Sequence, residues 1–199
     1  MGVVNVTPDS FSDGGKTASA ALAIEAARGL ITDGADILDI GGESSRPGAV
    51  PVSLDEELSR VIPVIEALAG EGACVSVDTR HAPVMVAAMA AGATIINDIT
   101  ALEGDPQSLE IVAPSKASVV LMHMQGDPRT MQEAPVYTDV VAETGAYLLT
   151  RIRACQQAGI ATERIAIDPG IGFGKSQEHN LDLLRGLSAF TGLECPVVL

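Results

Sequence analysis

The sequence predicts an α/β fold with a parallel sheet at its centre. Short apolar runs recur along the chain at intervals of roughly 30 residues, as expected for strands that are covered on both faces. Amphipathic helical patterns lie between these runs. Polar residues follow almost every run, as expected where the carboxyl ends of parallel strands carry a site.

The strand candidates are short and rich in Val, Ile and Leu. They span residues 3–6, 37–40, 74–77, 94–96, 119–122, 165–167 and 196–199. Apolar residues make up 47% of the chain but aromatic residues only 3%, so aliphatic side chains must fill the core. Such a core is usual where helices pack on a parallel sheet.

Helical patterns fill the intervals between the strands. The apolar residues between Leu22 and Ile31 share one helical face, and Gly34 ends that helix. A capping box at residues 53–56 opens a second helix, which Pro63 should kink. Four further helices are predicted. One begins near Pro83, one at Asp105-Pro106, one spans residues 138–157, and one begins at the cap Ser176.

The 199 residues fit one domain, because nothing in the pattern marks a linker. An open doubly wound sheet and a closed (β/α)8 TIM barrel share this alternation, and the polar strand ends favour the barrel. Seven strand candidates are one fewer than a barrel needs. We therefore expect a single barrel domain over residues 1–199 that is truncated after the seventh strand.

The charge balance restricts the partners. Lys and Arg number 12 against 26 Asp and Glu, and the net charge of −14 disfavours nucleic acid and anionic membranes. The longest nearly apolar run, residues 82–96, is too short to cross a membrane. The three cysteines form no C-x-x-C motif, which argues against a disulfide framework or a zinc site and is typical of the cytoplasm.

The residues after the strands are candidates for a site. They are Asn5, residues 41–43, Asp78, Asn97, Asp98, His123 and Asp168. After Asp168, glycines at 170, 172 and 174 expose bare backbone, but the spacing fits neither a P-loop nor a dinucleotide fingerprint. The long polar loops at residues 7–16, 43–52 and 123–137 are expected to act as lids.

Six segments together resemble the successive signatures of the dihydropteroate synthase family. They are MGVVNVTPDSFSDGG (1–15), DIGGESSRPG (39–48), SVDT (76–79), INDI (96–99), LMHMQG (121–126) and DPGIGFGK (168–175). The resemblance implies a (β/α)8 barrel that joins p-aminobenzoate to 6-hydroxymethyl-7,8-dihydropterin diphosphate. Pyrophosphate is released in this step of folate biosynthesis, and the enzyme is a known sulfonamide target.

The resemblance places pterin contacts at Asp78, Asn97 and Asp168. Carboxylates suit this ligand because a pterin presents adjacent N–H donors along one edge, and an amide can both donate and accept. Met122 and Phe173 would form apolar walls, with the backbone of Gly172 beside them. On sequence alone, Asp78 could instead cap the third helix and Asn97 could be a turn residue. For Met122 and Phe173, the sequence alone favours core packing.

A second group of residues would serve the diphosphate and the aminobenzoate. Asn5 matches the position that holds Mg²⁺ in the family, and a hard cation is expected beside pyrophosphate. Ser45, where the family commonly has Thr, and Arg46 would supply a hydroxyl and a fixed positive charge. Phe11 and Pro47 would shape the aminobenzoate pocket. The expected partners are these small-molecule substrates, and a homodimer is a further possibility.

The family mechanism is dissociative, so no protein nucleophile is needed, and Asp78, Asp168 and Arg46 are the catalytic candidates. Three alternatives stay open. A corrinoid-dependent methyltransferase would share the pterin contacts without needing residues 45–48, a pterin-binding module would lack catalysis, and a metal-dependent hydrolase should show an H-x-H pair. The family also has Lys, Arg and His signatures that would follow position 199. We therefore expect residues 1–199 alone to be inactive.

Overall fold

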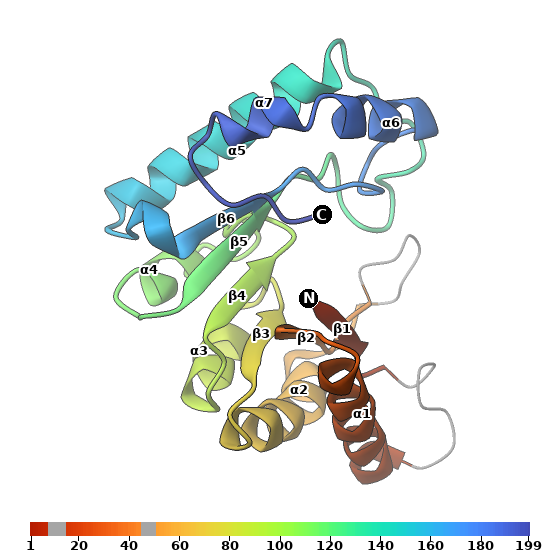
Figure 1. Ribbon diagram of the computed structural model, residues 1–199, viewed down its shortest axis with the longest axis vertical. Helices are drawn as coiled ribbons and strands as arrows, with labels where there is room; N and C mark the ends of the chain where they lie inside the picture. Colours follow the sequence, from red (N-terminus) through yellow and green to blue (C-terminus); the bar gives the residue numbers. More distant parts are fainter. Residues whose placement is uncertain (8–14, 45–50) are drawn as a thin grey trace. The chain divides into compact units, whose positions relative to one another are not determined.

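The computed structural model describes residues 1–7, 15–44 and 51–199 (Figure 1). Its contacts divide the chain into two compact units, which are described separately. The first begins at Met1 and continues to Asn97, and the second runs from Asp98 to Leu199. Each strand is followed by at least one helix in both units, as the sequence predicts, although α6 is followed directly by α7 in the second.

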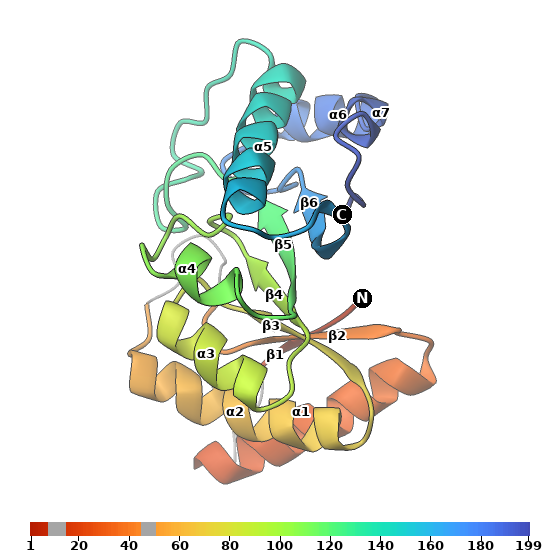
Figure 2. The ribbon, with the colours of Figure 1, turned by 90° about the vertical axis from the view of Figure 1, so that its left-hand side faces the viewer.

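The first unit is a four-stranded parallel sheet with three helices. Its elements are β1 (Gly2–Asn5), α1 (Gly15–Thr32), β2 (Ile37–Gly41), α2 (Leu54–Gly70), β3 (Cys74–Asp78), α3 (Ala82–Ala90) and β4 (Ile95–Asp98). The strands are ordered β1-β2-β3-β4. The three helices lie side by side on one face of this sheet (Figure 2).

The core of the first unit lies between the sheet and these helices. Val4, Ile40, Val77 and Ile96 are register neighbours across the four strands, and all four are buried. A Cβ on Gly42 would meet Val61 of α2, so the row that contains Ile40 faces the helices. Because side chains alternate along a strand, the next residue of each strand faces the other way.

Local signals set the helix ends. The Ser53 hydroxyl oxygen accepts a hydrogen bond from the Glu56 N–H, and α2 then continues through Pro63 to Gly70. Gly34, with φ at +101°, follows α1 in the left-handed conformation that glycine adopts without strain. Pro83 lies in the first turn of α3, where no backbone donor is needed.

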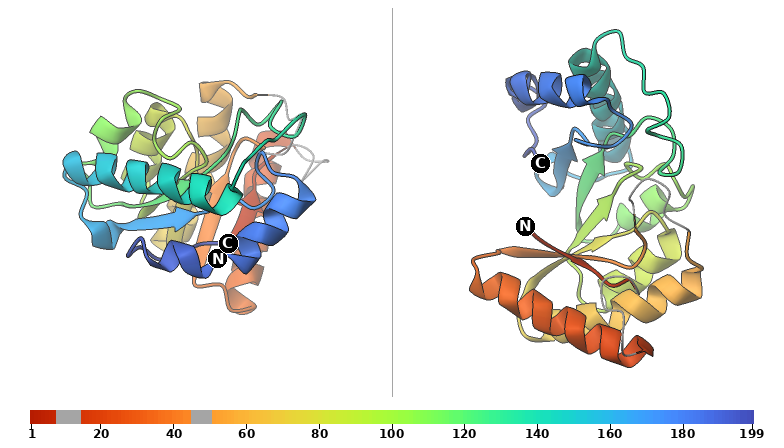
Figure 3. Two further views of the ribbon diagram at one scale, coloured as in Figure 1. Left: turned by 90° about the horizontal axis from the view of Figure 1, so that it is seen from above. Right: turned by 90° about the vertical axis from the view of Figure 1, so that its right-hand side faces the viewer.

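The second unit contains two parallel strands and their helices. Its elements are α4 (Ser108–Val112), β5 (Ser118–Met122), α5 (Val140–Gln157), the 3-10 helix η2 (Thr162–Arg164), β6 (Ile165–Asp168), α6 (Gln177–Arg185) and α7 (Ser188–Thr191). Helix α5 packs on β5, and both α6 and α7 pack on α5 (Figure 3). Leu121, Leu148, Ile167 and Phe190 are fully buried here.

The seventh predicted strand is only partly formed. In residues 196–199, Val197 makes a single parallel bridge to Ile167, with Ile167 N–H donating to the Pro196 carbonyl and Val198 N–H to the Ile167 carbonyl. The segment therefore lies beside β6, but two hydrogen bonds make a bridge and not the strand that the sequence predicts. The described chain has six strands.

Among the described residues, no helix is long and apolar enough to span a membrane.

Candidate functional site

Four candidate residues form one row across the first unit. Asn5 is the register partner of Gly41, Gly41 of Asp78, and Asp78 of Asn97, so the four residues lie at one level near the carboxyl ends of the strands, on the face away from the helices. A Cβ on Gly41 would lie 3.4 Å from Asp78 Oδ2 and 3.5 Å from Asn5 Oδ1. Glycine thus leaves a space above the sheet that is flanked by two oxygen atoms.

The amide of Asn97 is held by a carboxylate beneath it. Asn97 Nδ2 donates to Asp39 Oδ2 at 2.9 Å, and Asp39 lies two residues before Gly41 on the same face of β2. Asp39 is buried, which raises its pKa, and the hydrogen bond from Asn97 opposes this rise. Because one amide donor is engaged, the amide plane of Asn97 is fixed.

In the second unit, Met122 and Asp168 are register partners at the ends of β5 and β6. Asp168 Oδ1 accepts a hydrogen bond from the Gly170 N–H at 2.6 Å, which fixes the orientation of the carboxylate. Burial raises the pKa of Asp168, while the Gly170 N–H and the charge of Lys175 lower it. Burial therefore favours the protonated form of Asp168, and the Gly170 N–H and the Lys175 charge favour the ionised form.

The glycine loop after β6 is held closely against the residues after β5. Gly170, with φ at +70°, permits this approach, since a Cβ there would collide with the carbonyl oxygen of His123. The backbone of Gly172 is held from both sides, because its N–H donates to Asn180 Oδ1 at 2.9 Å and its carbonyl accepts from Gln132 Nε2. Phe173 follows, half-buried, in the same loop.

A buried lysine and a buried histidine lie at the base of this loop. Lys175 Nζ is 3.0 Å from His123 Nδ1 and also contacts the carbonyl oxygens of His123 and Phe173. Burial lowers the pKa of Lys175 to about 8, and the charge of Asp168 opposes this shift. Burial, aided by the charge of Lys175, lowers the pKa of His123 to about 4.

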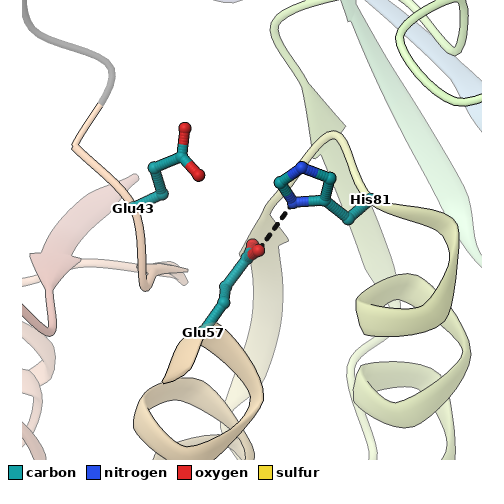
Figure 4. A group of neighbouring side chains, drawn as sticks. All are labelled: Glu43, Glu57 and His81. Atoms are coloured by element: carbon teal, nitrogen blue, oxygen red, sulfur yellow. Dashed lines mark hydrogen bonds and ion pairs between the residues drawn. The ribbon is translucent and has the colours of Figure 1, made fainter. Parts of the chain in front are cut away.

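In the part of the chain that the structure describes, one group of metal-ligand type is formed by Glu43, Glu57 and His81, with ligand atoms within 4.8 Å of one another (Figure 4). Most of its ligand atoms already have partners, but Glu43 Oε2 is buried without a hydrogen-bond partner among the described residues. Glu57 accepts from the Thr79 hydroxyl at 2.6 Å and lies 2.7 Å from His81 Nδ1, while Glu43 pairs with Arg80 at 2.7 Å. The group therefore acts as a clamp between α2 and the loop after β3.

The predicted site residues thus have different outcomes. Asn5, Asp78 and Asn97 lie together in the first unit, and Met122, Asp168, Gly172 and Phe173 lie at the strand ends and loop of the second. Phe11, Ser45, Arg46 and Pro47 lie outside the described residues. Asp98 caps the following turn by accepting from the backbone of Thr100 and Leu102.

The structure gives partners to three residues whose contacts the sequence does not indicate. The signal for Asp39 was a charged residue inside the apolar run of residues 37–40, which a buried strand does not carry without a partner. The signal for Lys175 was weaker, because a lysine before a helix is usually exposed. The sequence marks His123 only as a polar residue at a strand end, and its contact with Lys175 joins residues 52 positions apart.

Comparisons with known proteins decide the family. The whole chain, residues 1–199, matches the family described as pterin binding enzymes. It is 51% identical over 199 residues to the dihydropteroate synthase of Escherichia coli (strain K12), covering 100% of this chain and 70% of that protein. The chain belongs to the dihydropteroate synthase family.

Solved dihydropteroate synthases have the same fold. The Xanthomonas albilineans enzyme with 4-aminobenzoic acid superposes with a TM-score of 0.92 at 52% identity, over 99% of this chain and 70% of the other. The same enzyme in complex with 7,8-dihydropteroate gives a TM-score of 0.88 at 48% identity, with the same coverage. The predicted class, a (β/α)8 barrel of which these residues form part, is confirmed.

Proposed function

We propose that the protein is a dihydropteroate synthase, a transferase that joins p-aminobenzoate to 6-hydroxymethyl-7,8-dihydropterin diphosphate and releases pyrophosphate. The row formed by Asn5, Gly41, Asp78 and Asn97 carries the proposal. It presents a carboxylate, an amide and an open backbone at one level, as recognition of a flat, polar-edged ring requires. The solved relatives with 4-aminobenzoic acid and with 7,8-dihydropteroate support the substrate class.

Asp168, Asn97 and Asp78 are proposed to read the pterin. Asp168 has one oxygen directed to the Gly170 N–H, so its second oxygen would accept from the ring. Asn97, oriented by Asp39, would present its amide to the pterin, as the family pattern implies. Met122 and Phe173 are proposed as apolar walls and Gly172 as backbone beside the ring.

Asn5 is proposed as a ligand of Mg²⁺. Asn5 Oδ1 and Asp78 Oδ2 flank the space above Gly41, and neutral and charged oxygens are the ligand types that Mg²⁺ prefers. When bound, the ion would neutralise charge on the diphosphate and assist its departure. Ser45 and Arg46 would receive the diphosphate, and Phe11 and Pro47 the aminobenzoate, at positions that the family pattern assigns.

The residues perform a dissociative reaction without a protein nucleophile. Positive charge develops on the pterin methylene as pyrophosphate leaves, so carboxylates fixed in advance stabilise it at little reorganisation cost. Asp168 is such a group, because the Gly170 N–H already orients it. Arg46 would stabilise the departing anion, and the arylamine nitrogen then forms a bond to the methylene carbon and loses one proton to solvent.

The setting of the enzyme belongs to the same proposal. Its substrates are small molecules, and we propose a cytoplasmic homodimer. The three cysteines are free, which suits a reducing compartment. A relative at 51% identity is a dihydropteroate synthase, and this favours the synthase over the corrinoid methyltransferase.

The leaving group provides the test. In the full-length protein, Asn5→Ala should weaken Mg²⁺-dependent binding of the pterin diphosphate by about tenfold or more, because an ion ligand is lost. Binding of a pterin without phosphates should stay within about twofold of wild type, since Asn97 and Asp168 are untouched. Calorimetry with both ligands measures the difference, and wild-type protein should form 7,8-dihydropteroate with release of pyrophosphate when both substrates are present.

Two results would contradict the proposal. Equal losses for the two ligands would remove Asn5 from the metal site. Failure of the wild-type protein to release pyrophosphate with both substrates would reject the synthase itself.

A further inference from the structure

Lys175 is buried in a manner that its position in the sequence does not explain. Its exposure is only 2%, whereas a lysine is almost never fully buried without partners. All three contacts of Nζ are to neutral acceptors: His123 Nδ1 at 3.0 Å, the His123 carbonyl at 3.1 Å and the Phe173 carbonyl at 2.9 Å. Because the ammonium donates to Nδ1, the ring proton of His123 is on Nε2.

Neutral acceptors satisfy the hydrogen bonds of the ammonium but do not balance its charge. A buried charge is costly unless an opposite charge is near. Asp168 supplies that charge, because its carboxylate raises the pKa of Lys175 while the ammonium lowers the pKa of Asp168. The two groups therefore favour each other's ionised form within the second unit.

The geometry connects these two groups through one glycine. A Cβ on Gly170 would lie 3.3 Å from Lys175 Nζ, so the ammonium lies directly beside this residue. The N–H of Gly170 in turn donates to Asp168 Oδ1 at 2.6 Å. Lys175 thus supports the backbone that orients the carboxylate, while its own hydrogen bonds go to His123 and Phe173.

We propose that Lys175 is a positioning residue of the pterin site, which fastens the loop of residues 169–174 to the end of β5 and keeps Asp168 ionised. The proposal rests on the proposed function and deepens it. Asp168 would otherwise become protonated more readily because it is buried, and a protonated carboxyl is a weaker acceptor for a pterin N–H. The lysine serves this role through Asp168 and does not touch the substrate.

Several other titratable groups lie near Lys175. They are His123 after β5, Tyr137 in the following loop, Glu143 and Tyr147 on α5, and Asp168 on β6. Of these, Asp168 is the group whose charge acts on Lys175 most directly. The titration of the Asp168 carboxyl is therefore the quantity to measure.

The experiment replaces Lys175 by Gln in the full-length protein, which keeps a donor and removes the charge. Lys116→Gln, at an exposed lysine, is the matched control. Infrared difference spectra against Asp168→Asn give the midpoint of the Asp168 titration in each protein. We expect Lys175→Gln to raise this midpoint by about one unit or more, whereas Lys116→Gln leaves it unchanged.

Pterin affinity is measured by calorimetry over the same pH range. We expect Lys175→Gln to lose affinity about tenfold at neutral pH and to recover part of it as the pH rises, because Asp168 then ionises without help. A loss that is the same at every pH, or an unchanged Asp168 midpoint, would overturn the proposal and leave Lys175 a purely structural residue.

The infrared titration and the calorimetry distinguish failure of this inference from failure of the proposed function. If wild-type protein binds no pterin, the proposed function fails, but the infrared midpoint still tests the effect of Lys175 on Asp168. If Lys175→Gln does not fold, the wild-type spectrum decides, since a protonated Asp168 at neutral pH overturns the proposal and an ionised one supports it.

Discussion

Asp168 is fixed both by a local hydrogen bond and by a charge from a residue further along the chain. It ends β6, accepts a hydrogen bond from the Gly170 N–H two residues later, and lies in the field of Lys175. The first of these contacts is local and follows from the Asp-Pro-Gly sequence. The influence of Lys175 depends on the fold of the loop, which the sequence does not display.

Asp168→Asn should weaken binding of a pterin without phosphates. The Asn oxygen can still accept from Gly170, so the amide nitrogen would face the pterin and oppose a donor with a donor. The unpaired buried group should cost about 1–3 kcal/mol, or about 5- to 150-fold in affinity. Calorimetry on the full-length protein measures this, with the exposed Asp182→Asn as control.

Unchanged affinity in Asp168→Asn would exclude this residue from the pterin contact. A similar loss in Asp182→Asn would point to a general effect on the unit instead, since Asp182 pairs only with Arg185 among the contacts described.

Residue types at strand ends could be predicted, but their partners could not. Asp78, Asn97 and Asp168 stand out because each is a polar residue directly after an apolar run. Asp39 and Asn97 are 58 residues apart, and only the parallel register brings them together. Contacts of this kind depend on the register, which short apolar runs specify poorly.

At the scale of elements, the strands and most helix ends follow from local signals. Ser176 caps α6 as predicted, and the ring of His179 completes a capping box that a Glu or Gln usually provides. Helix α4 begins at Ser108, after the predicted start at Asp105-Pro106, because Asp105 Oδ1 accepts from the Gln107 N–H and forms a turn first. Caps are local, whereas the exact first turn depends on competing side-chain bonds.

Strand β2 provides the next prediction. Gly41→Ala should leave the fold nearly unchanged, because the new Cβ would meet Asp78 and Asn5 at 3.4–3.5 Å, which is ordinary van der Waals contact. The methyl group would nevertheless occupy the space between Asn5 Oδ1 and Asp78 Oδ2. We therefore expect binding of the pterin diphosphate with Mg²⁺ to fall about tenfold or more while the melting temperature changes by only about 2 °C.

Gly29→Ala is the matched control, since a Cβ there meets nothing within 4 Å on the surface of α1. It should retain full affinity and gain slightly in stability, as alanine does in helices. If Gly41→Ala binds the diphosphate like wild type, the space above Gly41 is not part of the site.

At the scale of the whole molecule, alternation of strands and helices predicts the α/β class, and the polar strand ends predict the barrel. The seventh strand was predicted from an apolar run that forms only one bridge, because propensity says nothing about how many partners are in reach. The division into two units could not be predicted either, since no linker composition marks the boundary near Asn97.

The stability of the molecule should fall on the acid side through His123. Burial lowers the pKa of His123 to about 4, from 6.5, so the folded protein resists taking up this proton. The contribution is fully present above about pH 6.5 and is lost as the pH falls through about 4. The free energy of unfolding of the full-length protein, from urea titrations at several pH values, should therefore decline over this window.

His123→Gln removes the titrating ring and should flatten the decline, while leaving an oxygen that can accept from Lys175. His81 gives the control of opposite sign, because its hydrogen bond to the Glu57 carboxylate raises its pKa. Its contribution is present below about pH 6.5 and is lost as the pH rises through the raised value, so His81→Gln should reduce stability at acid pH. A decline in His123→Gln parallel to that of wild type would show that other groups control acid unfolding.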